Sequence, residues 1–130
     1  MILLDTHAWL WWVGEPNLLS PAVRDRIGGA LDDAQLGVAS LRAWETAMLF
    51  AKGRIELTLP VEELVATCER LQGFSFLPLT ARIAVAASRL APLYPDPADR
   101  FIVATAISAN ATLVTKDERL RAFPGVRTIW

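Results

Sequence analysis

The sequence predicts an α/β fold of three layers, in which a parallel β-sheet carries helices on both faces. Short apolar segments of four to six residues recur along the chain and are typical of strands buried on both sides. Segments with helical periodicity separate them, and strands that alternate with helices form parallel sheets. The strand segments are "ILLD" (2–5), "LGVAS" (36–40), "FSFLPL" (74–79), "TLVT" (112–115) and "VRTIW" (126–130).

Local start and stop signals delimit the helices between these strands. Ser20 followed by Pro21 is an N-cap and first-residue pair. Ser40 and Thr80 are expected to cap two further helices, and Gly53 is expected to end the first of these. The predicted helices cover about 6–13, 21–30, 40–52, 60–71, 80–90 and 96–109, followed by a short helix that Thr115 caps.

Length and composition indicate a globular protein with one core. A chain of 130 residues with 53% hydrophobic and 21% charged residues suits a single domain over 1–130. No apolar run approaches the roughly 20 residues of a membrane span. The apolar N-terminus has no basic region and is interrupted by Asp5, and the only cysteine, Cys68, cannot form an intrachain disulfide. We therefore expect a cytoplasmic protein without a membrane partner, with Cys68 buried as a small apolar residue.

The overall charge does not suggest a nucleic-acid-binding protein. Lysine and arginine total 13 and aspartate and glutamate total 14, for a net charge of −1. Nucleic-acid-binding proteins usually carry an excess of basic residues. This nearly even number of acidic and basic residues is compatible with nucleic-acid binding only if several acids hold a divalent cation, which would reverse the local charge.

The stretch "PDPADRFIVATA" places Asp96 and Asp99 in front of a helix that is apolar almost all the way round. Asp96 before Pro97 is expected to be the N-cap. Asp99 then falls at the third helical position, where it either closes a capping box or points into a functional site.

Three further acids follow predicted strands. Asp5 ends the first strand, Glu45 lies in the helix after the second, and Asp117 comes two residues after the fourth. Each has a local explanation, because Asp5 could cap a helix and Glu45 could be solvated. Capping explains Asp117 less well, since Thr115 and Glu118 already form a T-x-x-E box. Large apolar neighbours surround Glu45 on its helix, where a carboxylate without a partner is costly.

The carboxyl ends of parallel strands meet at one edge of the sheet, which is where such folds bind ligands. Asp5, Glu45, Asp99 and Asp117 are expected to meet there, and a divalent cation would offset their repulsion. Oxygen ligands select Mg²⁺ or Mn²⁺, and one cysteine with one histidine cannot supply a zinc site. Such a site suits phosphoryl chemistry.

The chain resembles the PIN-domain ribonucleases that act as toxins (VapC) of bacterial VapBC-type toxin–antitoxin pairs. The matching segments, in order, are "LLDTHAWLWW" (3–12), "VASLRAWETAMLFAKGRIEL" (38–57), "DPADRFIVATA" (96–106), "LVTKD" (113–117) and "VRTIW" (126–130). The resemblance implies a roughly five-stranded parallel sheet of order 3-2-1-4-5 and metal-dependent cleavage of RNA. It also implies a homodimer, a VapB-like antitoxin that blocks the site, and a larger toxin–antitoxin assembly.

The resemblance also suggests accessory residues. Thr6 and Thr115 would orient a carboxylate or a water, or else only cap helices. Arg100 would orient Asp99 or touch phosphate, or else cover the sheet edge with its stem. One subgroup of the family carries "H-x-D-P-F-D-R", where this chain has Tyr94 for the histidine and Ala98 for the phenylalanine.

The remaining polar and aromatic side chains have competing interpretations. His7, the only histidine, is expected to pack or to contact substrate rather than to act as a base. Trp9, Trp11 and Trp12 are expected to divide between the core and a protein interface, although stacking on RNA bases is an alternative. Candidate phosphate contacts, each otherwise solvated surface, are Arg42, Lys52, Arg54, Arg82 and Lys116.

Other functions fit the sequence less well. A phospho-receiver domain needs an acidic pair after the first strand and an acid after the third, and neither is present. An aspartyl phosphatase needs a second Asp where His7 stands. A PIN fold without catalysis, acting as a protein-binding module, remains an alternative that the complete set of acids argues against.

Overall fold

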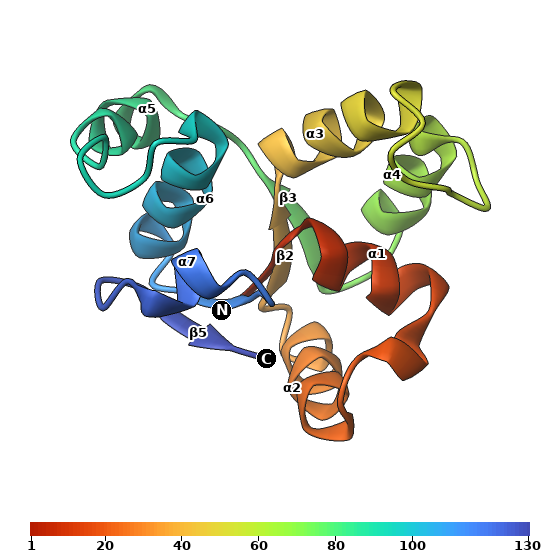
Figure 1. Cartoon of the computed structure of the whole chain (residues 1–130). Helices are drawn as coiled ribbons and strands as arrows, with labels where there is room; N and C mark the ends of the chain where they lie inside the picture. The colour runs from red at the N-terminus through yellow and green to blue at the C-terminus, as the bar shows by residue number, and fades with distance from the viewer.

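The computed structural model describes all 130 residues and contains one sheet of five parallel strands (Figure 1). The strand order is β3-β2-β1-β4-β5, as expected. Ile2 of β1 lies opposite Leu36 of β2 on one side and Thr112 of β4 on the other. The strands are β1 (Ile2–Leu4), β2 (Leu36–Ala39), β3 (Phe74–Leu77), β4 (Thr112–Val114) and β5 (Arg127–Ile129).

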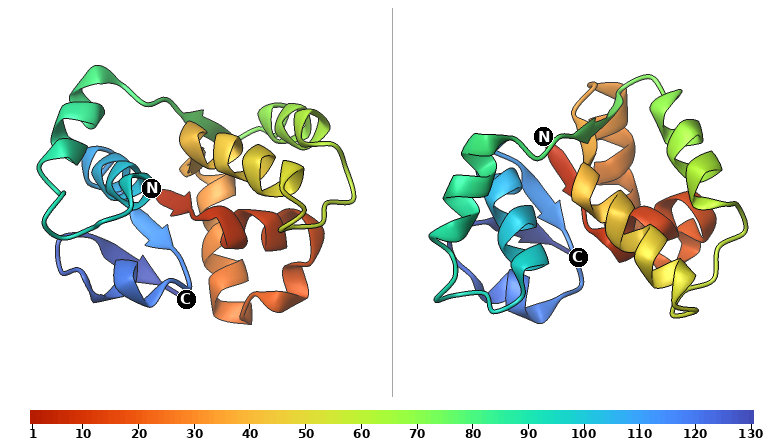
Figure 2. Two further views of the ribbon diagram at one scale, coloured as in Figure 1. Left: turned by 45° about the horizontal axis from the view of Figure 1, so that its top comes forward. Right: turned by 90° about the horizontal axis from the view of Figure 1, so that it is seen from above.

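Helices cover both faces of the sheet, which gives the predicted three layers (Figures 1 and 2). Ile2 and Leu4 of β1 face α1, α2 and α4, whereas Leu3 between them faces α6 and α7, because successive side chains of a strand point to opposite faces. The helices are α1 (Thr6–Gly14), the 3₁₀ turn η1 (Pro16–Leu18), α2 (Pro21–Asp32), α3 (Ser40–Ala51), α4 (Val61–Glu69), α5 (Ala81–Ser88), α6 (Pro97–Ser108) and α7 (Glu118–Ala122). None of the helices has the length and hydrophobicity that a membrane span requires.

The core on the α1 side is built around Trp9. Its ring is fully buried and meets Phe76 of β3 edge-on, and its Nε1 donates a hydrogen bond to Cys68 Sγ at 3.4 Å. Cys68 is buried, as predicted, and this burial raises the pKa of its thiol. Trp12 stacks on Phe74 at the margin of the same core.

The core on the other face is built around α6. Ile102, Val103 and Ala106 are buried against the sheet, as the apolar pattern predicts, while α5 packs against the outer side of α6 and buries Ala104. One side chain of the pattern, Ile107, is half exposed. Asp99 is buried in the first turn of this packed helix.

Four of the predicted helix signals are confirmed. Ser20, Thr80 and Asp96 each accept a backbone hydrogen bond at the start of a helix. Gly53 follows the end of α3 with φ of +68°, in the left-handed region that glycine adopts without strain.

Two predicted caps are wrong. Ser40 is the first residue inside α3, and Ala39 takes the N-cap position. Thr115 lies outside α7, and the helix begins two residues later than its T-x-x-E box predicts. Asp117 is the actual N-cap and accepts a hydrogen bond from the Arg119 amide at 2.8 Å. Capping therefore explains Asp117 better than the sequence predicted, because Asp117 rather than Thr115 is the N-cap of α7.

Candidate active site

Four predicted acids lie at the carboxyl edge of the sheet, and we call them the acidic site: Asp5, Glu45, Asp99 and Asp117. Asp5 directly follows β1 and Asp117 comes after β4, the neighbouring strand. Glu45 is on α3, which starts where β2 ends. The first turn of α6 brings Asp99 to this edge because the helix then runs back to the opposite edge, where β4 begins.

Asp5 is the most closely held of the four acids. Its Oδ1 accepts a hydrogen bond from the Thr6 amide and forms an ion pair with Arg42 Nη2, both at 2.9 Å. Its Oδ2 accepts a hydrogen bond from the Thr115 hydroxyl at 2.7 Å. These contacts fix the orientation of the carboxylate. Asp5 does cap α1, and it also belongs to the site.

Arg42 is the main residue that the sequence interpretation missed. It was expected on the surface or on phosphate, but only 5% of it is exposed, and it forms ion pairs with both Asp5 and Glu45. Burial opposes its charge, yet the two carboxylates raise the pKa of the guanidinium above its ordinary value. The spacing of three between Arg42 and Glu45 on one helix is a signal that could have indicated this pair.

Asp99 and Asp117 form a second pair, linked by Arg119 of α7. Arg119 Nη2 lies 3.5 Å from Asp99 Oδ2 and 3.3 Å from Asp117 Oδ2. Burial, aided by the charge of Asp96, raises the pKa of Asp99 above its ordinary value. The pKa of Asp117 is lowered, because hydrogen bonds from Arg119 outweigh its burial.

The donor set of the acidic site is chemically suited to a hard cation, since it consists of carboxylate oxygens with the Thr6 and Thr115 hydroxyls beside them. In this arrangement, however, no three acidic, histidine or cysteine side chains are grouped as they would be around one metal ion. The structure gathers the four acids at one edge as two arginine-linked pairs. Binding of an ion by all four requires their side chains to move closer together.

Arg100 does not contact Asp99, so the first of its predicted roles is wrong, while a contact with phosphate stays a prediction. Its guanidinium donates to the backbone carbonyls of Tyr94 at 2.5 Å and Pro95 at 2.8 Å. It therefore fastens the segment before α6, where Asp96 serves as the predicted cap. Tyr94 is itself buried, and burial together with the charge of Asp99 raises its pKa to about 12.

An aromatic and basic rim borders the acidic site. Lys116 Nζ lies 4.8 Å from the centre of the Trp11 ring, a cation–π contact, and Trp130 packs against the same ring at 5.5 Å. His7 meets Trp11 edge-on. The pKa of His7 is lowered, first by partial burial and then by Lys116, so the imidazole is neutral at pH 7.

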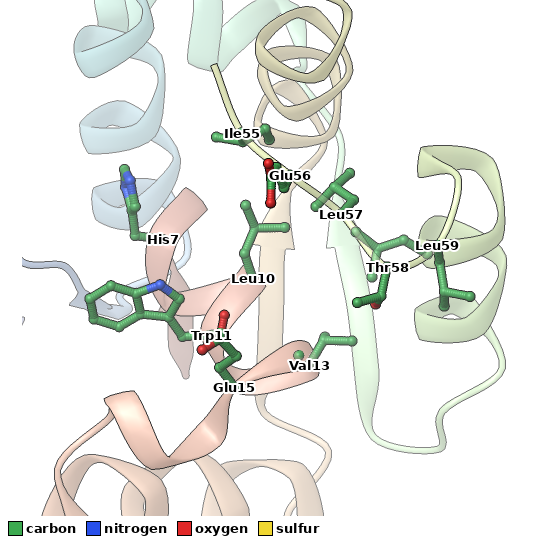
Figure 3. A pocket seen from close by; sticks show the side chains of 12 residues that line it. His7, Leu10, Trp11, Val13, Glu15, Ile55, Glu56, Leu57, Thr58 and Leu59 are labelled. Atoms are coloured by element: carbon green, nitrogen blue, oxygen red, sulfur yellow. The ribbon is translucent and has the colours of Figure 1, made fainter. Parts of the chain in front are cut away.

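A groove of about 420 Å³ continues from this rim, along α1 (Figure 3). Leu10, Trp11 and Val13 come from α1, and the segment 55–59 supplies the facing side chains (Figure 3). The groove is mostly apolar and its first lining residue, His7, is two positions from Asp5. None of the four acids of the acidic site lines this groove.

Comparisons with known proteins agree with this fold. A profile of the PIN domain family matches residues 2–126. The chain is 41% identical to ribonuclease VapC22 of Mycobacterium tuberculosis, over 99% of this chain and 98% of that protein.

Solved structures share the architecture at low sequence identity. VapBC2 of Rickettsia felis, bound to a DNA fragment from its promoter, gives a TM-score of 0.72 at 15% identity and covers 99% of this chain and 98% of that one. DNA-bound VapBC of Salmonella typhimurium gives 0.67 at 19% identity, covering 98% and 96%. FitAcB of Neisseria gonorrhoeae gives 0.59 at 23% identity, covering 100% and 97%. The family profile and the full-length relative together show that this chain belongs to the PIN domain family.

Proposed function

We propose that this chain is a metal-dependent endoribonuclease and the toxin of a toxin–antitoxin pair, acting on RNA in the cytoplasm. The observation that carries the proposal is the acidic site itself: four carboxylates from four segments lie at the carboxyl edge beside β1 and β4, where the strand order reverses. The 41% identity to a protein named a ribonuclease supports the same activity.

Asp5, Glu45, Asp99 and Asp117 would hold Mg²⁺ or Mn²⁺. A bound cation of this kind activates water and stabilises negative charge on a phosphate. The surrounding residues of this chain would orient the carboxylates that hold the cation. Thr115 and the Thr6 amide fix Asp5, the Thr6 hydroxyl donates to Glu45 Oε2 at 3.4 Å, and the first turn of α6 holds Asp99. Lys116 at the rim would position the RNA backbone.

Cleavage of RNA by the purified chain, without antitoxin, tests this proposal. Total cellular RNA is incubated with Mn²⁺, Mg²⁺ or EDTA, and the new ends are mapped. We expect metal-dependent cuts by the wild type and none by Asp99→Asn. Asp96→Asn is the matched control, because asparagine is as good an N-cap as aspartate and should keep cleavage.

Each result discriminates between assignments. If Asp96→Asn loses more activity than Asp99→Asn, the roles of cap and ligand are reversed. If a folded wild type makes no cuts under any metal, the protein-binding module without catalysis replaces the nuclease. Arrest of host growth on expression of the chain alone, relieved by Asp5→Ala, tests the toxin role separately.

An antitoxin is the protein partner that we propose, as in the VapBC complexes whose fold the chain shares. The groove of Figure 3 suits it, because the groove is mostly apolar and includes His7, two positions from Asp5. To block the acidic site, a peptide bound in this groove would have to extend past His7 toward Asp5.

A second copy of the chain is the other partner that we propose. Val85 of α5 and Ile107 of α6 are each at least half exposed, on two helices that pack together. A small hollow between these helices, lined by Ile83, Ala86 and Leu90, makes this face suitable for self-association. Light scattering of the wild type beside Val85→Glu tests this, and a monomeric wild type would contradict it.

A further inference from the structure

Arg42 lies within the acidic site rather than beside it. Its Nη2 is 2.9 Å from Asp5 Oδ1, and its Nη1 is bonded to Glu45 Oε2. We propose that Arg42 is a built-in counter-ion that competes with the divalent cation for Asp5 and Glu45, and so weakens metal binding. The inference rests on the proposed function, because it concerns the same carboxylates.

The burial of Arg42 makes this competition strong. Only 5% of the residue is exposed, its Nε has no hydrogen-bond partner, and a guanidinium does not deprotonate in a protein. The two carboxylates therefore provide nearly all the compensation for its buried charge. A cation bound to Asp5 and Glu45 must either displace the guanidinium or lie close to it, and both cost free energy.

Arg119, which links Asp99 and Asp117, differs from Arg42 because its charge is not buried. Its side chain is 65% exposed, so water screens its charge and can solvate it when a cation replaces it. The structure thus contains one buried competitor and one exposed partner. The competition should depend on Arg42 much more than on Arg119.

Mn²⁺ titration of the full-length chain, followed by the electron paramagnetic resonance signal of unbound Mn²⁺, tests the inference without any activity measurement. Arg42→Met keeps the aliphatic stem and removes the charge. We expect its Kd for Mn²⁺ to be lower than that of the wild type, by about tenfold. Arg42→Lys, a compact charge that cannot hold both carboxylates in the same way, should lie between the two.

Arg70→Met is the matched control. It removes one positive charge at the end of α4, just before β3 and so at the opposite edge of the sheet, and its Kd should equal that of the wild type. Thermal melting in EDTA is measured in parallel. Arg42→Met should melt at a lower temperature than the wild type, because two carboxylates lose their partner, and Mn²⁺ should restore more stability to it than to the wild type.

The outcomes separate this inference from the proposed function. Equal or weaker Mn²⁺ binding by folded Arg42→Met and Arg42→Lys, with a wild type that binds, overturns the role of Arg42 and leaves the nuclease proposal standing. If neither the wild type nor the variants bind Mn²⁺, both are overturned. If Arg42→Met does not fold, Arg42→Lys decides alone, and a Kd equal to that of the wild type overturns the inference.

Discussion

The Thr115 hydroxyl donates a hydrogen bond to Asp5 Oδ2 at 2.7 Å, although the two residues are 110 positions apart in the sequence. The contact exists because β1 and β4 are neighbouring parallel strands and both residues follow their strands directly. The same hydroxyl accepts a hydrogen bond from the Asp117 amide at 3.1 Å. A single side chain therefore links two acids of the site.

Replacing Thr115 by valine removes this link while keeping the shape of the side chain. Because partners that orient ligands typically affect metal affinity or activity by 10- to 100-fold, we expect RNA cleavage to fall by about that factor. Thr115→Ser retains the hydroxyl and should keep most of the activity. Measured rates of Thr115→Val equal to those of the wild type would show that the remaining contacts of Asp5 suffice.

The pKa shifts of Asp99 and Asp117 predict stability changes of opposite sign. The pKa of Asp99 is raised in the folded chain, so its ionised form destabilises the fold at neutral pH. Asp99→Asn should raise the melting temperature at pH 7 in EDTA. The gain should disappear as the pH falls below the ordinary value of 3.8, where the carboxyl is protonated in both states.

Asp117→Asn should do the reverse. The pKa of Asp117 is lowered, so its charge stabilises the fold above pH 3.8, and this contribution is lost as the pH falls through the folded pKa. Asparagine preserves the cap of α7, so the variant should lower the melting temperature at pH 7 through charge alone. Two variants that shift the melting temperature in the same direction would contradict these assignments.

Divalent metal should stabilise the wild-type chain. A ligand that binds only the native state adds about 2.7 kcal/mol at one hundred times its Kd. We expect millimolar Mn²⁺ to raise the melting temperature of the wild type and to have a smaller effect on a variant with both Asp5 and Asp99 changed to asparagine. The absence of a shift in the wild type would argue against the metal site.

A charge in the groove should separate antitoxin binding from catalysis. Val13 lines the groove and is 37% exposed, so Val13→Asp is tolerated by the fold more readily than a core change. We expect it to weaken binding of the cognate antitoxin at least tenfold while RNA cleavage by the chain alone is kept. Unchanged antitoxin affinity, measured by titration calorimetry, would place the partner on another surface.

The sequence by itself determined the class of fold, most element positions, and the acids at the sheet edge. These follow from local rules: apolar segments of strand length, caps such as Ser20 and Thr80, and the position of Asp5 immediately after a strand. The family resemblance supplied the strand order. Each of these features depends on residues close in the chain or on an ordered set of motifs.

Only the tertiary structure decided how the charges of the site are compensated. Arg42 reaches Asp5 because α3 packs beside α1, and the exposed Arg119 of α7 reaches Asp99 in the first turn of α6. An isolated arginine in a sequence is most often solvated, so local pattern placed Arg42 on the surface. Ion pairs between distant segments depend on how the helices pack. For this reason only the folded structure shows that Arg42 is buried and belongs to the site.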